Sequence, residues 1–209
     1  MDDKDRHRRL RLLARRLNKE RKKQAKQIDI LCNDLIAAQR DFIKRLDTVS
    51  FTANFYESII GPTDLCGLLH TASELVQDEI PDVNAAFFLR RQETFELHVF
   101  ESGPPNTLQK QDLETCFTAE VAANICKSNK TCSLDDMFAM GLEGNLVSLN
   151  KIAAATIPLG QLGSSLGFIF IYRPSQKKFT AEELKNVMAI APGLSRAIQS
   201  CQVLSHSTQ

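Results

Sequence analysis

The stretch KIAAATIPLGQLGSSLGFIFIYRPSQ, residues 151–176, decides the fold of this chain. Residues 152–172 run for 21 positions without a charge, a length that would also suit a membrane-spanning helix. Pro158, Gly160 and Gly163 argue against such a helix, because proline and glycine favour turns and divide the run into two pieces of strand length. The second piece contains FIFIY, a β-branched and aromatic run that is typical of a buried strand. The stretch therefore predicts a β-hairpin.

A long helix is expected directly after the hairpin, in the sequence FTAEELKNVMAIAPGLSRAIQSCQVL of residues 179–204. Thr180 is a favourable N-cap residue, and Glu183 stands three positions later, where a capping box places its glutamate. The pattern predicts a helix that begins after Thr180 and closes the domain.

A hairpin that passes directly into a closing helix resembles the end of a GAF domain, a small-molecule sensing module. The resemblance extends backwards over residues 62–204, carried by element order and by the landmarks IPLG and FTAEEL. PAS-type and roadblock-type domains have related folds. Helices are expected at residues 63–80, capped by Thr63 or Asp64, and at 111–127, and strands at 83–90, 95–101, 131–134 and 153–159. The resemblance implies an α+β fold for residues 62–209, with an antiparallel sheet flanked by helices.

The charge of the chain is divided unevenly along its length. The 209 residues are 43% hydrophobic, enough to build one core, and carry a formal net charge of +1. Residues 1–26 hold 12 Lys and Arg against 4 Asp and Glu, a net of +8, whereas the remaining 14 basic and 21 acidic residues give a net of −7. A basic arm therefore precedes a mildly acidic domain. Because no apolar run near the N-terminus resembles a secretory signal, we expect a cytoplasmic protein.

Apolar residues recur at alternating spacings of three and four from Ile28 onward, which is the heptad pattern of a coiled coil. No proline or glycine precedes Gly61, so residues 1–61 are predicted to form a basic arm and one long coiled-coil helix. The domain is too small to cover the apolar face of such a helix along its whole length, so we expect a homodimer. The residues predicted to join the two copies are Ile28, Leu31, Leu35, Phe42, Val49 and Tyr56.

The heptad pattern is interrupted at Arg45 and Thr52, where the neighbours Leu46 and Ala53 shift the apolar stripe. Upstream, the same spacing adds Leu10 and Leu17, but Arg21 and Gln24 then occupy apolar positions and interrupt the pattern. A helix folded back on its own domain is the alternative to a homodimer.

The basic arm, residues 1–26, suits several kinds of partner. Its cations could contact nucleic-acid phosphates, or an acidic membrane surface with Leu10, Leu13 and Leu17 as the apolar face. An acidic protein is a third partner, and a solvated helix face needs none. The arm has no Phe, Tyr or Trp to stack on bases, and we do not expect sequence-specific DNA binding.

Residues that commonly carry catalysis are scattered. The six cysteines form no CxxC pair, so we expect free thiols and small buried residues. Cys66 and His70 stand four apart, as half a metal site, but further ligands at suitable spacing are lacking. We therefore expect no enzyme, and the sequence names no cofactor. A thiol-dependent redox enzyme that uses Cys116, Cys126 or Cys132 is the alternative.

The GAF resemblance implies a place for a small ligand: one face of the sheet, under an irregular segment at residues 133–151. This segment, SLDDMFAMGLEGNLVSLNK, is apolar but rich in Gly and Asp, which suits an adaptable pocket and equally suits a filled core. The expected ligand-binding residues are Phe88, Arg90, Met137, Phe138, Met140, Leu142 and Ile169. Arg90 would pair with an anionic group, unless it is an ordinary surface residue.

These patterns together predict a non-enzymatic sensory or regulatory protein, with a GAF-like domain that is dimerised through an N-terminal helix. A ligand-free protein-interaction scaffold is the first alternative. A redox enzyme and a nonspecific nucleic-acid binder are the others.

Overall fold

The computed structural model describes residues 3–62, 64–92, 94–100, 108, 110–144, 149–161 and 164–207. The chain divides into two compact units, Met1–Asp47 and Thr48–Gln209. Helix α1 (Asp3–Ser58) spans the first unit and contributes the first residues of the second. The second unit also contains α2 (Leu65–Glu79), β1 (Asn84–Arg91), β2 (Thr94–Phe100), α3 (Lys110–Cys116), α4 (Ala119–Ser128), β3 (Cys132–Ser133), α5 (Leu134–Ala139), β4 (Ile152–Gln161), β5 (Ser164–Pro174) and α7 (Ala181–Ser207).

Five strands form one antiparallel sheet in the order β2-β1-β5-β4-β3. The predicted hairpin is confirmed, because β4 pairs with β5 along its length, with Ile157 opposite Ile169. Gly163, in the predicted turn, lies outside the described residues. The first strand of the domain, β1, pairs with the last, β5. No helix within the described ranges is long and apolar enough to cross a membrane.

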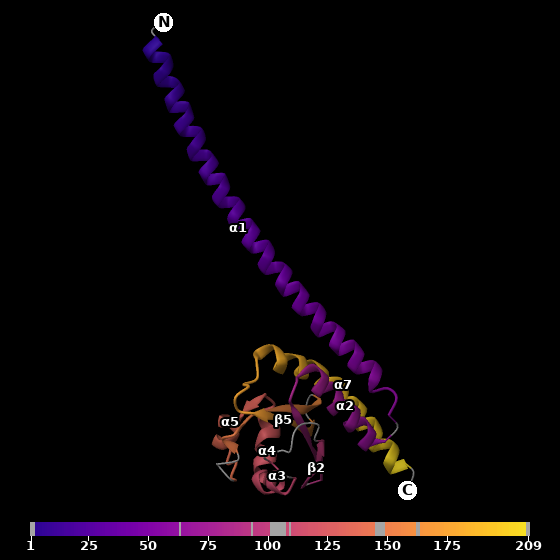
Figure 1. Cartoon of the computed structure of the whole chain (residues 1–209). Helices are drawn as coiled ribbons and strands as arrows, with labels where there is room; N and C mark the ends of the chain where they lie inside the picture. The colour runs from indigo at the N-terminus through magenta and orange to yellow at the C-terminus, as the bar shows by residue number, and fades with distance from the viewer. Residues whose placement is uncertain are drawn as a thin grey trace. The chain divides into compact units, whose positions relative to one another are not determined.

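The sheet is covered on both faces, and side chains alternate between two hydrophobic clusters. One face packs against α2, α7 and the last turns of α1, with the fully buried Phe55. The other face packs against α3, α4 and α5, which Figure 1 shows gathered on that side of the sheet. Double coverage explains the FIFIY run of β5, since a strand buried on both faces needs no polar residue at every second position.

Gly167 makes the pairing of β1 with β5 possible. Its φ is +141°, and a Cβ at this position would lie 1.8 Å from the carbonyl oxygen of Phe88. Only glycine accepts both the backbone angle and the close approach. Gly167 therefore acts inside the sheet, where it lets the two strands approach each other.

The start of α7 confirms the predicted capping box. The backbone N–H of Glu183 donates to Thr180 Oγ1 at 3.2 Å, and the N–H of Thr180 donates to Glu183 Oε2 at 2.6 Å. Glu183 also accepts two hydrogen bonds from Arg173 of β5, both at 2.9 Å. The first turn of α7 is thereby tied to the end of the hairpin.

Three local predictions need correction. The single helix expected at 111–127 is two helices, α3 and α4, because Thr118 caps a new helix by accepting from the N–H of Val121 at 3.3 Å. The strand expected at 131–134 is shortened to the two residues of β3. The segment 133–151 is partly regular, since Ser133 and Asp136 form a capping box that starts α5; residues 145–148 lie outside the described residues.

The end of α1 packs within the second unit. Thr48 Oγ1 donates to Asn186 Oδ1 of α7 at 2.9 Å, and Asn186 Nδ2 donates to Glu79 Oε1 of α2 at 2.6 Å. Tyr56 lies against α7, where its hydroxyl donates to the carbonyl oxygen of Ala189 at 3.3 Å. One buried asparagine therefore joins three helices on the same face of the sheet.

Candidate functional site

The face of the sheet under α3, α4 and α5 holds most of the predicted ligand-binding residues. Phe88, Met137 and Leu142 are buried there, and Phe138 and Met140 pack at the edge of the same cluster. Phe88 comes from β1 and Met137 from α5, and the side chain of Met137 is fully buried.

Ile169 and Arg90 do not join this cluster. Ile169 packs on the opposite face, among residues that contact α2 and α7, so one pocket cannot be lined by both Ile169 and Phe88. Alternation along β5 places Ile169 there, since its neighbours Phe168 and Phe170 take the other face. The side chain of Arg90 is exposed, and its Nε donates to the carbonyl oxygen of Gln92 at 3.2 Å.

Aromatic side chains from the chain itself occupy the centre of this face. Phe117 stands between α3 and α4 in the sequence, and its ring centroid lies 4.7 Å from that of Phe88, 5.8 Å from that of Phe168 and 5.0 Å from that of Phe170. Phe88 and Phe168 stack at 4.7 Å with an interplanar angle of 15°. Phe117 was not among the predicted site residues, although Thr118 beside it is a recognisable N-cap that places Phe117 at a helix junction.

Three cysteines lie in the same cluster, and each is buried: Cys116 on α3, Cys126 on α4 and Cys132 on β3. Burial raises the pKa of the Cys126 thiol above its ordinary 9.0, which lowers its thiolate content. Gly144 is pressed against Cys116, since a Cβ on Gly144 would lie 2.3 Å from the sulfur. The three thiols lie among the apolar side chains of this cluster, and Cys132 Sγ also donates to the carbonyl oxygen of Lys130 at 3.4 Å.

His70, which the sequence analysis weighs with Cys66 as half a metal site, contacts Glu74 and Phe100. His70 Nε2 lies 3.5 Å from Glu74 Oε1, and its ring lies 5.7 Å from that of Phe100. Among residues that the structure describes, no group of three or more His, Cys, Asp or Glu could hold a metal ion.

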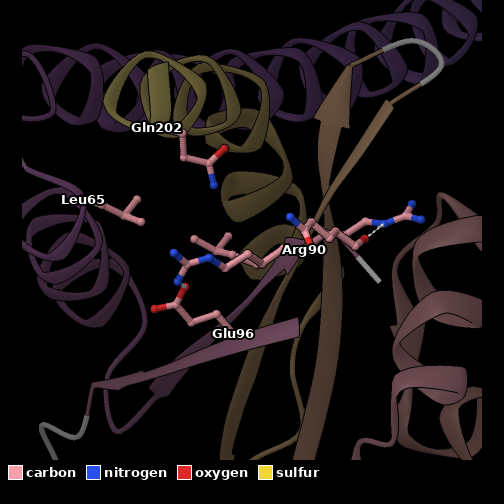
Figure 2. Close-up of a pocket in the computed structure, with 7 residues that line it drawn as sticks. Leu65, Arg90, Glu96 and Gln202 are labelled. Atoms are coloured by element: carbon pink, nitrogen blue, oxygen red, sulfur yellow. Dashed lines mark hydrogen bonds and ion pairs between the residues drawn. The ribbon is translucent and has the colours of Figure 1, made fainter. Parts of the chain in front are cut away.

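A hollow of about 500 Å³ lies at the end of the sheet, beside the turn from β1 to β2. Figure 2 shows Leu65 of α2 and Gln202 of α7 on one side and Glu96 of β2 on the other. Glu96 Oε2 lies 3.3 Å from Arg91 Nη1. This hollow was not predicted, because its lining residues come from distant parts of the sequence and no local pattern links them.

The predicted seam of α1 is exposed over most of its length. Ile28 is 59% exposed, Leu31 66%, Leu35 69%, Phe42 61% and Val49 63%. Tyr56 differs, because its ring packs on α7 so closely that a Cβ on Gly193 would lie 1.8 Å from Tyr56 Cε1. The role of all six residues in dimerisation stays a prediction.

Comparison with known proteins identifies the fold. No family model matches the sequence, and no curated protein is similar to it. Solved structures do match: the GAF domain of a phosphoenolpyruvate-protein phosphotransferase from Coxiella burnetii has a TM-score of 0.60 at 13% identity, covering 77% of this chain and 98% of that one. The chain has a GAF-like fold. The predicted α+β fold class is thereby confirmed.

Other solved structures with this fold differ in function. A putative GAF sensor protein from Burkholderia vietnamiensis has a TM-score of 0.53 at 15% identity, covering 75% of this chain and 98% of that one. Free methionine-R-sulfoxide reductase from Neisseria meningitidis, in complex with its substrate, has a TM-score of 0.55 at 12% identity, covering 75% and 91%. Identities this low establish the fold alone, since one fold serves sensors and enzymes alike.

Proposed function

We propose that this chain is a non-enzymatic regulatory protein of the cytoplasm that works as a homodimer, with its GAF-like domain as the signalling module. The exposed seam of α1 carries the proposal. Ile28, Leu35, Phe42 and Val49 repeat every seven residues, so the matching helix of a second copy would cover them together. Six cysteines without a disulfide suit a reducing compartment.

The proposal has two versions, which differ in whether a small molecule binds to the face of the sheet under α5. In the sensor version a ligand binds there, whereas in the scaffold version this face is a core and the domain docks a protein. The position of Phe117 against Phe88 and Phe168 supports the scaffold version. A ligand at that place would first have to displace a buried aromatic ring.

Native mass spectrometry of the full chain separates these versions. The expected species has twice the single-chain mass of 23.4 kDa, with nothing added. An additional small mass that is released on denaturation would support the sensor version. A species of single-chain mass at micromolar concentration would contradict the homodimer.

Enzymatic reduction of free methionine sulfoxide is the second candidate function, because reductases share the fold. The burial of Cys116, Cys126 and Cys132, with the raised pKa of Cys126, opposes it. Incubation with free methionine-R-sulfoxide and dithiothreitol should yield no methionine above the rate of the buffer alone. Turnover that disappears in Cys126→Ala or Cys116→Ala would establish an enzyme.

A further inference from the structure

The first turns of α1 expose leucines on one side of the helix. Leu10, Leu13 and Leu17 recur at spacings of three and four, which places them on a common face. They are 57%, 62% and 64% exposed. Arg21 and Gln24 follow where the apolar positions would continue. This leucine face is therefore separated from the seam that begins at Ile28.

The opposite side of the same turns is basic. Arg8, Arg15, Lys19, Lys22 and Lys26 follow one another at spacings of three, four and seven, which gives a continuous stripe along the helix. Between residues 6 and 26 there are 11 Lys and Arg and a single acidic residue, Glu20. Leu12 lies within this basic stripe, 58% exposed, four residues after Arg8 and three before Arg15.

The leucine face and the basic stripe together indicate which kind of anionic partner suits this part of the helix. Nucleic acid would engage the basic stripe through its phosphates but would leave the leucine face in water. An anionic lipid surface engages both, because the leucines enter the boundary between headgroups and acyl chains while the cations contact the headgroups. A helix of this composition lies in the plane of the surface, and no helix of the described part of the chain could cross a membrane.

We propose that residues 6–26 bind an anionic membrane surface, with Leu10, Leu13 and Leu17 inserted at the level of the headgroups and the basic stripe facing the anionic lipids and water. This inference does not depend on the function proposed for the GAF-like domain. It assigns a location to the protein: the cytoplasmic face of a membrane that is rich in acidic phospholipid.

The test is co-sedimentation of the full chain with vesicles, either of phosphatidylcholine alone or with about a third of phosphatidylserine. Leu13→Ser and Leu12→Ser form a matched pair, because both replace an exposed leucine of the same helix and lie outside the heptad seam. They differ only in the face that loses its side chain. Binding of each protein to duplex DNA is measured in parallel, and light scattering checks that the mass in solution is unchanged.

The chain should bind the phosphatidylserine vesicles at least about tenfold more tightly than the neutral ones. Leu13→Ser should weaken that binding about tenfold, whereas Leu12→Ser should stay within about twofold of the unaltered chain. Equal effects of the two substitutions on vesicle binding would overturn the proposal, as would the absence of a preference for phosphatidylserine. Tight binding to DNA together with either of those results would identify nucleic acid as the partner.

Discussion

Arg173 is a buried cation whose every nitrogen is engaged. Nη1 and Nη2 donate to the two carboxylate oxygens of Glu183, both at 2.9 Å, and Nε donates to the carbonyl oxygen of Lys177 at 2.7 Å. Its guanidinium carbon lies 4.5 Å from the centroid of Phe179. Removal of Glu183 would leave this charge buried without its counter-ion, which is costly.

Glu183 makes the stability of the domain depend on pH. Burial alone would raise the pKa of its carboxyl, but hydrogen bonds from Arg173 and Thr180 outweigh burial and hold the pKa below its ordinary 4.5. A carboxylate with a lowered folded-state pKa adds stability above its unfolded pKa, and this contribution is lost as the pH falls through the folded-state value. We predict that Glu183→Gln lowers the free energy of unfolding at neutral pH by about 2 kcal/mol. The free energy of unfolding of this variant should also fall less steeply as the pH is lowered.

Urea unfolding measured from neutral pH down to about pH 3 checks this prediction. Glu114→Gln is the control, because Glu114 forms an exposed ion pair with Lys110 at 3.8 Å. This substitution should change the free energy of unfolding by less than about 0.5 kcal/mol. If the free energy of unfolding of Glu183→Gln falls with pH as steeply as that of the unaltered chain, other carboxyls dominate the pH dependence.

Gly167 allows a sharper prediction. Alanine at this position would combine a φ of +141° with a contact of 1.8 Å to the Phe88 carbonyl oxygen, so we expect Gly167→Ala to cost at least about 3 kcal/mol of folding free energy. Gly61→Ala is the matched control, since the nearest atom to its Cβ would be 3.9 Å away. Chemical denaturation of both variants gives the comparison. Equal stabilities would mean that β1 and β5 are not in this register.

At the scale of the element, the junction of α3 and α4 determines what the sheet face holds. Phe117 stands at this junction and fills the space over Phe88, Phe168 and Phe170. We predict that Phe117→Ala costs about 4 kcal/mol, because it leaves a cavity against three other rings. Phe138→Ala, at the half-buried edge of the same cluster, should cost about half as much.

Thermal unfolding compares the two phenylalanine variants. A dry apolar cavity binds small apolar molecules, so benzene should raise the melting temperature of Phe117→Ala and leave that of the unaltered chain unchanged. Stability of Phe117→Ala equal to that of the unaltered chain would mean that this face is not a packed core.

Elements with local signals were predictable from the sequence. The hairpin and the start of α7 depend on proline, glycine and a capping box, all of which act within a few residues. The break between α3 and α4 also had a signal, Thr118, which the apolar periodicity of residues 111–127 obscured. Alternation along β5 separates Ile169 from Phe168, but alternation alone does not say which helices cover which face. That choice depends on how distant helices pack.

At the scale of the whole molecule, assembly depends on α1. Phe51 and Phe55, in the last turns of this helix, pack in the core of the domain. A seam of large apolar side chains upstream of these residues stays exposed in a single chain. Burial of an exposed leucine or phenylalanine contributes about 2 kcal/mol, so several such residues on one line favour self-association strongly.

We predict that the unaltered chain is a dimer at micromolar concentration and that Leu35→Glu with Phe42→Glu makes it monomeric or prone to aggregate. Two buried glutamates facing their copies would add charge repulsion to the lost apolar contact. Ile36→Glu with Ile43→Glu is the matched control: the spacing is the same, but each residue lies one position further along, about 100° around the helix. Both isoleucines are also exposed, at 48% and 50%. Light scattering should therefore report a dimer for the control and for the unaltered chain. A compact monomer of the unaltered chain, or equal dissociation by both double variants, would mean that the helix does not self-associate along this seam.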